Sequence, residues 1–370
     1  MNVTSLRRPA VLGAALVLGL GLTACGAANE EPASGADTGG STGLAGTLNG
    51  GGASSQEAAQ NAWRAGFQET NPDVTVNYDP IGSGGGREQF IAGGFPFAGS
   101  DSYLDNEDGE LDAATERCAG QAPIEVPNYV SPIAVIYNLD GVDDLKLNPE
   151  ALAGIFAGDI TEWDDPAIAE TNPGAELPAE TINPVHRSDE SGTTGNFTNY
   201  LATVAEDAWT HGEVEEWPVD GGEGASGTSG VVAAVRNGAG SIGYADASQA
   251  GDLGTAAIGV GAGFEEPTPE AAAKILEVSP AADTAGEGQM IYDLDYTTEE
   301  AGVYPIVLTS YLIACPSYDD RAEGDLVKAY LSYVISEDGQ ATAAENAGSA
   351  PLAPAIAQEA RATVDAITVG

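Results

Sequence analysis

Residues 181–195 read TINPVHRSDESGTTG and join a strand-like segment to a helix-like one. The first part of this stretch, Thr181 to Val185, has the composition of a buried strand, and Thr194 to Ala205 has the periodicity of a helix. Small and hydroxyl residues, Ser191 to Gly195, stand at the start of that helix. In parallel α/β sheets ligands collect beyond the carboxyl ends of strands, where free helix N–H groups point outward. The stretch therefore predicts an α/β fold with a binding site at this turn.

The same stretch holds a basic residue with an acidic neighbour. Arg187 lies four residues before Ser191, with Asp189 between them. A guanidinium can bind a tetrahedral oxyanion with two N–H groups while a carboxylate fixes its orientation. The alternative is a surface Arg–Asp ion pair, which would stabilise the fold little.

Strand-like and helix-like segments alternate along the rest of the chain, which predicts α/β order with mainly parallel sheets flanked by helices. The predicted strands are Val74 to Tyr78, Ile133 to Asn138, Thr181 to Val185, Ser241 to Tyr244 and Ile306 to Ile313. The predicted helices are Gln56 to Glu69, Asn148 to Phe156, Thr194 to Ala205, Gly230 to Asn237 and Leu326 to Ser336.

Two further loops resemble the turn at Ser191. One runs through Gly51-Gly52-Ala53-Ser54-Ser55 into the helix at Gln56, and the other through residues 81–86, IGSGGG, into a helix from Arg87 to Ala92. Either loop taken alone could be an ordinary turn with an N-cap residue. Three such loops in one chain favour a shared site.

The N-terminal residues 1–24 are predicted to be a signal peptide rather than part of the fold. Arg7 and Arg8 precede an apolar run, Val11 to Leu22, that is too short to span a bilayer. The run ends in Leu22-Thr23-Ala24-Cys25, which resembles the bacterial lipobox and marks Cys25 as the lipid attachment site. The alternative is an ordinary cleaved signal with an incidental cysteine. Residues 25–45 are rich in Gly, Ala, Ser and Thr with acidic residues, which predicts a flexible tether.

Cys118 and Cys315 are the two cysteines that remain. In an oxidising compartment an even pair favours a disulfide, and two buried free thiols are the alternative. A disulfide would bring an early and a late segment of the chain side by side.

Acidic residues far outnumber basic ones, 57 to 12, and the formal net charge is −45. This charge argues against nucleic acid as a partner and against a polybasic membrane-surface mode. It does not exclude an anion ligand, because carboxylates more than about 8 Å from a site are largely screened at physiological salt. Donors in direct contact decide binding.

The motifs along the chain resemble those of the phosphate-binding proteins of phosphate ABC transporters, the PstS family. The longest match runs through ITEWDDPAI at 160–168, NPG at 172–174, LP at 177–178 and HRSDESGTT at 186–194. Shorter matches are IGS at 81–83, AGSD at 98–101, GSIGY at 240–244 and YPI at 304–306. Together they span nearly all of the chain after the tether.

The resemblance implies a two-lobed periplasmic-binding-protein fold, a Venus-flytrap clamp with two hinge crossings. One lobe would comprise residues 46–129 and 305–370, and the other residues 130–304. The cysteine pair would then lie within the first lobe. The clamp would be a monomeric lipoprotein, anchored at the outer face of the cell membrane through Cys25. It would pass inorganic phosphate to the permease subunits of an ABC importer, with no metal, no cofactor and no catalysis.

The resemblance also assigns a role to each site residue. Ala53 and Ser54 would offer amides and a hydroxyl, Ser83 a hydroxyl and Asp101 an acceptor. Arg187 would bind the anion with its guanidinium, held in place by Asp189. The helix-start donors would be Ser191, Gly192 and Thr193.

Asp101 carries the most selective chemistry in this set. An ionised carboxylate facing an oxyanion is repulsive unless a proton lies between them. Monobasic and dibasic phosphate carry that proton, whereas sulfate near neutrality does not. Such a site would reject sulfate by several kcal/mol, at about 1.4 kcal/mol per tenfold in affinity. The alternative is that Asp101 is only a helix N-cap or a turn residue.

The sequence departs from the usual family pattern at three positions. Ser55 replaces a common aromatic residue, Gly84 replaces the second serine of a double-serine loop, and Pro96 stands where an aspartate is usual. These departures concern the first two loops and leave the stretch from Arg187 to Thr193 intact.

Three other functions stay open at this point. The same clamp could serve another oxyanion, such as sulfate, molybdate, a phosphonate or a phosphate ester, or could belong to a lipoprotein adhesin or signalling receptor that lost transport. A secreted phosphatase is the third, but the chain holds only His186 and His211 as histidines, and no nucleophile elbow, P-loop or metal-site spacing. His186 beside Arg187 is interpreted as a structural residue at a strand end.

Overall fold

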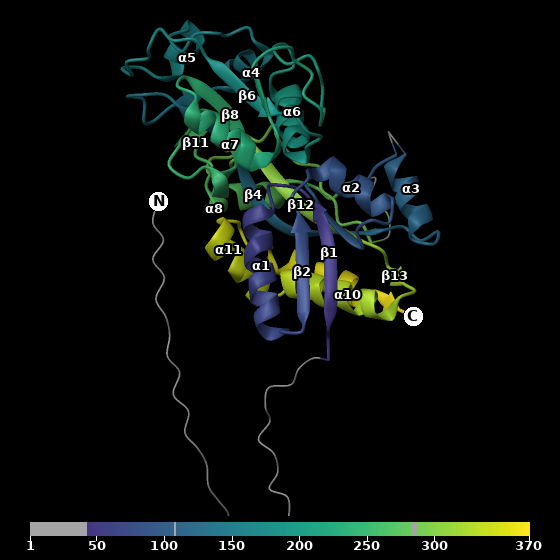
Figure 1. Ribbon diagram of the computed structural model, residues 1–370. Coiled ribbons are helices and arrows are strands. Elements are labelled where there is room, and N and C mark those ends of the chain that lie inside the picture. The colour runs from purple at the N-terminus through teal and green to yellow at the C-terminus, as the bar shows by residue number, and fades with distance from the viewer. Residues whose placement is uncertain (1–42, 107–108, 283–285, 287) are drawn as a thin grey trace, which may run out of the picture. The chain divides into compact units, whose positions relative to one another are not determined.

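The computed structural model describes residues 43–106, 109–282, 286 and 288–370 (Figure 1). The predicted signal peptide, Cys25 and the tether up to residue 42 lie outside the described residues. Among the described helices there is none of the length and apolarity needed to cross a membrane.

One large mixed sheet organises the described part of the chain. Its strand order is β2-β1-β3-β12-β4-β8-β6-β7, with β9 paired to β4 off this path. The strands are β1 Gly46–Gly52, β2 Val74–Asp79, β3 Phe97–Ser100, β12 Val307–Ala314, β4 Ile124–Asn138, β8 Ser241–Asp246, β6 Asn183–Arg187, β7 Glu223–Ala225 and β9 Gly254–Thr255.

The outer parts of this sheet are parallel and its centre is antiparallel. β1 pairs in parallel with β2 and β3, and β6 pairs in parallel with β7 and β8. The two central strands, β12 and β4, are antiparallel to each other and to their neighbours β3 and β8. Every residue of β12 is buried, which explains why its sequence is mostly apolar, with Thr309 and Ser310 as exceptions.

Helices cover the sheet and two small sheets complete the fold. The longer helices are α1 Glu57–Thr70, α2 Ser83–Ile91, α3 Glu110–Arg117, α4 Pro149–Ala157, α6 Gly192–Val204, α7 Gly227–Asn237, α10 Arg321–Val334, α11 Glu337–Ala347 and α12 Pro354–Asp365. The shorter elements are β5 Lys146–Leu147, α5 Pro166–Thr171, η1 Ala247–Gln249, β10 Ala257–Val260, β11 Gly263–Glu265, α8 Pro269–Ala273, α9 Ile275–Val278, β13 Ser317–Tyr318 and β14 Thr368–Val369.

The α/β order predicted from the sequence is confirmed. Each predicted strand and each predicted helix overlaps an element of the same type. Helix starts follow local chemistry: Asn148 caps α4 by accepting the amide N–H of Ala151 at 2.8 Å, and proline follows it at the first helical position. The sequence did not predict the glycine-rich β1, which is held between β2 and β3, or the helices α3, α11 and α12.

The buried apolar residues form two main clusters. Core I draws on residues 48–129, 290 and 312–367, and core II on residues 130–308. β4 passes from core I to core II between Tyr129 and Val130. β12 passes from core II to core I between Leu308 and Leu312. Figure 1 shows that core I joins the two ends of the described chain, because α1 and β1 lie beside α10 and α11. The lobe bounds given above remain a prediction.

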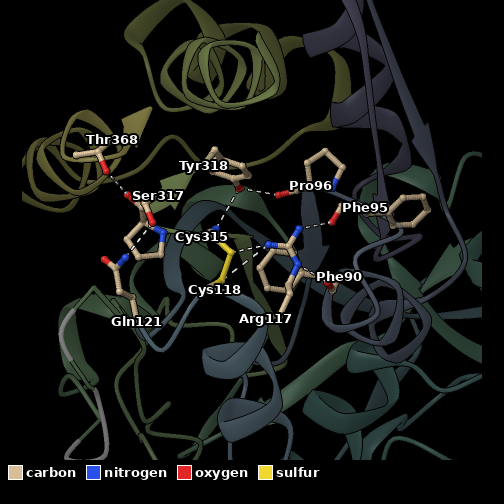
Figure 2. The surroundings of a disulfide bond; sticks show 11 residues. Phe90, Phe95, Pro96, Arg117, Cys118, Gln121, Cys315, Ser317, Tyr318 and Thr368 are labelled. Atoms are coloured by element: carbon tan, nitrogen blue, oxygen red, sulfur yellow. Dashed lines mark hydrogen bonds between the residues drawn. A yellow bond between two sulfur atoms is a disulfide. The ribbon is translucent and has the colours of Figure 1, made fainter. Parts of the chain in front are cut away.

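The structure joins Cys118 and Cys315 by a disulfide within core I, the pairing predicted from the sequence. Cys118 follows α3, Cys315 follows β12, and 197 residues separate them in sequence. Figure 2 shows Arg117 beside the bond, where its guanidinium donates to the carbonyls of Phe90 at 2.6 Å and Phe95 at 3.2 Å. The disulfide thus fixes α3 to the central sheet.

Candidate functional site

Asp101 lies directly after β3 and is 3% exposed. Its carboxylate accepts hydrogen bonds from three hydroxyls. Ser55 donates to both oxygens, at 2.9 and 2.6 Å, Thr193 donates at 3.2 Å, and Ser310 of β12 donates as well. An ionised carboxylate offers about four lone-pair sites. Three donors therefore leave room for one more proton donor at this group.

The electrostatics of Asp101 reflect its burial. Desolvation raises the pKa of this carboxyl, and the hydroxyls of Ser310, Ser55 and Thr193 together with the charge of Arg187 oppose the rise. A buried acceptor of this kind binds a partner that brings its own proton and disfavours one that does not.

Two helix starts meet at Asp101. The Oγ atom of Ser83, the first residue of α2, accepts the amide N–H of Asp101 at 3.1 Å. Gly192 begins α6 on the other side, and a Cβ atom at Gly192 would lie only 2.8 Å from that Oγ and 2.9 Å from the Cβ of Asp101. The site therefore needs glycine at position 192 for close approach.

The start of α6 supplies donors. Ser191 is its N-cap, and its Oγ atom accepts the amide N–H of Thr194 at 3.2 Å. First-turn amides such as those of Gly192 and Thr193 have no acceptor within their own helix. The positive end of the helix dipole adds to them, so this terminus favours an anion.

Arg187 ends β6 and is 2% exposed. Its Nε atom donates to Asp189 at 2.8 Å, and Nη2 forms an ion pair with the same carboxylate. Asp189 also accepts the amide N–H of Gly227, at 3.0 Å. Burial alone would raise the pKa of Asp189, but Arg187 and the amide of Gly227 outweigh it and lower that pKa. The predicted contact between Asp189 and Arg187 is present, and it fixes the guanidinium.

The first loop differs from expectation at Ala53. Its amide N–H donates to the carbonyl of Gly99 at 2.8 Å, so pairing with the chain around β3 already uses the donor that the sequence assigned to an anion. This is a correction to the expected role of Ala53. Ser54 follows it, is buried, and shares a hydrogen bond of 3.0 Å with Thr228 at the start of α7.

The structure adds residues that the sequence interpretation missed. Gly227 and Thr228 begin α7, within the segment GASGTSG at 224–230, which has the same small-residue composition at a helix start as the other three. That composition could have identified the start of α7 as part of the site from the sequence. Ser310 interrupts the buried apolar run of β12, and a hydroxyl at such a position was a second signal.

The predicted site residues come together around Asp101 and Arg187. Contacts link Ser83 and Thr193 to Asp101, and link Ser54 through the start of α7 to Asp189 and Arg187. Cys25 lies outside the described residues, and the disulfide lies apart from this set in core I. The contribution of each residue to ligand binding remains a prediction.

A cavity of about 1010 Å³ adjoins the site, with Asp101 in its wall. Arg87, Asn196 and Tyr296 also line it. Most of the charged residues in its wall are acidic: Asp101, Asp105, Glu110, Glu190, Glu213, Glu215, Glu216 and Asp293. Attraction of an anion must therefore come from donors in contact with it.

His186 has structural contacts. Its ring stacks on Trp217 with centroids 4.9 Å apart, and its two nitrogens lie 2.9 Å from the carbonyl of Arg187 and 3.3 Å from that of Gly221. These contacts support the interpretation of His186 as a strand-end residue.

Comparison with known proteins identifies the family of this chain. Residues 36–338 match the family model described as a PBP superfamily domain. The chain is 38% identical over 330 residues to the phosphate-binding protein PstS 3 of Mycobacterium leprae, which covers 86% of this chain and 88% of that protein. It is 35% identical over 355 residues to PstS 2 of Mycobacterium tuberculosis, covering 94% of this chain and 95% of the relative.

The fold itself has a solved counterpart. The structure of a high-affinity periplasmic phosphate-binding protein, PfluDING, bound with phosphate, aligns with a TM-score of 0.66 at 24% identity and covers 85% of this chain and 93% of that one. The chain therefore has the periplasmic-binding-protein fold. Taken together with the extended sequence matches, these findings mean that the chain belongs to the PBP superfamily and, within it, to the PstS phosphate-binding proteins.

Proposed function

We propose that this protein captures inorganic phosphate outside the cytoplasm and delivers it to an ABC importer. One observation carries the proposal: a buried carboxylate acceptor, Asp101, is linked by Thr193 to a helix start that offers anion donors, with Arg187 close by. Donors for the phosphate oxygens and an acceptor for the phosphate proton are both present. Relatives named as phosphate-binding proteins support the same ligand.

The proposal includes a hinged clamp. Residues 46–129 and 305–370 would form one lobe and residues 130–304 the other, crossing at β4 and just before β12. Contacts between the two segments at the site are polar, such as Ser54 with Thr228 and Asp101 with Thr193. Packing of Ile306 to Leu308 in core II suggests that the second crossing lies a few residues later than 304.

The proposal also covers the assignments of the individual residues. Ser54, Ser83, Arg187, Ser191, Gly192 and Thr193 would bind phosphate, with Asp101 as the acceptor and Asp189 orienting Arg187. Cys25 would carry the lipid that holds the protein at the outer face of the cell membrane, and the clamp would act as a monomer. Replacing Cys25 by serine should release the protein into the medium, and an unchanged membrane fraction would refute the lipid anchor.

Calorimetry of the purified protein tests the ligand. We expect tight binding of phosphate and binding of sulfate weaker by at least about a hundredfold, or ~2.7 kcal/mol. Molybdate and methylphosphonate serve as further competitors. Sulfate binding as tight as that of phosphate would overturn the role given to Asp101.

We also propose that the protein is not an enzyme. The hydroxyl of Ser55 faces a carboxylate rather than a histidine base, and His186 bonds to main-chain carbonyls. An ester substrate would need an activated nucleophile or a metal. Release of phosphate from p-nitrophenyl phosphate by the metal-free protein would revive the phosphatase hypothesis.

A further inference from the structure

Arg87, on the second turn of α2, is the centre of an ion cluster beside the site. Its side chain is 5% exposed. The Nε atom donates to Glu110 of α3 at 2.8 Å, and Nη1 donates to Ser100 of β3 at 3.2 Å. Glu110 and Ser100 both belong to the segment that contains core I.

The other partners of Arg87 come from the segment that contains core II. Glu215 binds the guanidinium with both oxygens, at 2.7 Å from Nη2 and 3.2 Å from Nη1. Glu190, in the loop after β6, lies 3.5 Å from Nη2. A single guanidinium therefore connects two segments whose apolar cores are separate.

The two acidic partners of Arg87 from this segment are both connected to Ser191, at the start of α6. Glu190 directly precedes Ser191, the N-cap of α6. The carbonyl oxygen of Glu215 accepts the amide N–H of Ser191 at 3.2 Å. Both acidic residues that Arg87 binds across the segments thus position the loop whose next residues meet Asp101.

The charges make this cluster dependent on Arg87. Burial opposes the charge of this guanidinium, but Glu215 and Glu110 outweigh it and raise the pKa of Arg87. Burial raises the pKa of Glu110, and Arg87 opposes that rise. Without Arg87, Glu110, Glu190 and Glu215 would face one another as like charges in a partly buried space, which is unfavourable.

Gly84 fits this cluster as well. A Cβ atom at Gly84 would lie 2.1 Å from the Cδ atom of Glu190. The departure from the usual serine at this position therefore gives Glu190 the space through which it reaches Arg87.

We infer that Arg87 is a positioning residue that holds the clamp closed over its ligand, through ion pairs to Glu215 and Glu190 that form only when the two lobes meet. The inference rests on the proposed function, because it requires a clamp that closes on phosphate. Arg87 makes no contact with the ligand in this scheme. Its effect falls on the lifetime of the closed state.

Kinetics distinguish this role from a direct contact or a general folding role. Loss of one partner of a buried, hydrogen-bonded charge pair acts mainly on dissociation. In Arg87→Gln we expect bound phosphate to leave faster by about tenfold or more, with an association rate within about twofold of wild type. Glu215→Gln, made from the other side of the contact, is expected to speed release as well.

The measurement is the release of radiolabelled phosphate from the purified protein after a chase with unlabelled phosphate, with affinity from equilibrium dialysis. The matched control is Arg321→Gln, the same substitution in an exposed pair with Asp325 on α10. In the double variant Arg87→Gln/Glu215→Gln, release is expected to speed up by less than the product of the two single effects, because these residues interact. Small-angle scattering with saturating phosphate reports the closed population, which Arg87→Gln should reduce.

A second variant tests the space at Gly84. Gly84→Ala should move Glu190 away from Arg87 and speed release by less than Arg87→Gln does. Melting temperatures without phosphate identify any variant that fails to fold, and Glu215→Gln then decides the question.

The results distinguish failure of the proposed function from failure of the role given to Arg87. If the wild-type protein binds no phosphate, the proposed function fails and this inference fails with it. If wild type binds phosphate and folded Arg87→Gln and Glu215→Gln release it at the rate of the Arg321→Gln control, the inference alone is wrong.

Discussion

The hydroxyl of Thr193 donates to the carboxylate of Asp101 at 3.2 Å, although 92 residues separate the two in sequence. The first residue belongs to the start of α6 and the second follows β3. This bond joins the group that would detect a ligand proton to the helix that would bind the ligand charge. We therefore expect changes at Thr193 to affect both the proposed acceptor and the proposed anion donors.

Asp101→Asn should relax the rejection of sulfate. The amide of asparagine can donate to an oxyanion that lacks a proton, whereas the carboxylate cannot. We expect phosphate affinity to fall by about 2 kcal/mol and sulfate binding to become measurable by calorimetry. Asp252→Asn, at an exposed carboxylate paired with Arg236, is the control. Unchanged exclusion of sulfate would contradict the acceptor role.

Arg187→Gln should weaken phosphate binding and leave sulfate rejection intact. The change removes the buried charge and leaves Asp189 without its main partner, at a cost of about 2–5 kcal/mol in binding. Calorimetry with both anions measures the two effects. Equal phosphate affinity in wild type and variant would mean that the pocket lies elsewhere.

Added salt should speed the association of phosphate. The net charge of −45 and the acidic wall of the cavity repel an approaching anion, and salt screens that repulsion. Stopped-flow association rates in rising sodium chloride measure the effect. A rate that falls with salt would indicate a local positive field that guides the anion inward.

Glu125→Gln should stabilise the protein above neutral pH. This side chain of β4 is 0% exposed, accepts the amide N–H of Leu104 at 2.8 Å, and bonds to Gln289. Burial raises its pKa from 4.5 to about 7. Because the folded state holds this proton more tightly than the unfolded state, the wild-type free energy of unfolding falls as pH rises from about 4.5 to about 7.

The glutamine cannot ionise, so that part of the pH slope should vanish in Glu125→Gln. At pH 8 the gain should be about 3 kcal/mol. Urea unfolding at pH 5 and pH 8 provides the comparison, with the exposed Glu116→Gln as control. The same slope in Glu125→Gln and wild type would disprove the assignment.

Removal of the disulfide should lower stability and spare binding. Cys118→Ser with Cys315→Ser opens a covalent loop of 197 residues, which typically costs about 2–4 kcal/mol of unfolding free energy. Both cysteines lie in core I, away from the anion donors. Thermal unfolding should show the loss, while calorimetry on the folded variant should give the wild-type phosphate affinity. A large loss of affinity would mean that the bond also shapes the site.

The sequence was most informative where local pattern decides structure. The buried strand before Arg187, the cap at Ser191 and the small residues after it are all set by neighbours in the chain, so the fold class and the α6 part of the site followed from them. Asp101 and Ser83 were assigned to the site only through the resemblance to the PstS family, because the local sequence around them does not by itself indicate a binding role.

Long-range packing decided what the sequence did not predict. Ser310 and Thr228 reach the site only because β12 and α7 pack where they do. The amide of Ala53 is used by Gly99, a strand pairing that local pattern does not specify. The glycine-rich β1 has weak intrinsic strand preference and exists because β2 and β3 bond to it on both sides.

The pairing of β4 with β12 has a mechanical consequence. The two strands pair over Val307–Ala314 with one register shift, between Ser310 and Tyr311, and this ladder runs through the point where β4 leaves one core and enters the other. A ribbon of two bonded strands flexes across its flat face more readily than it shears in its plane. In the proposed clamp, we therefore expect opening to favour one rotation axis that passes through this strand pair.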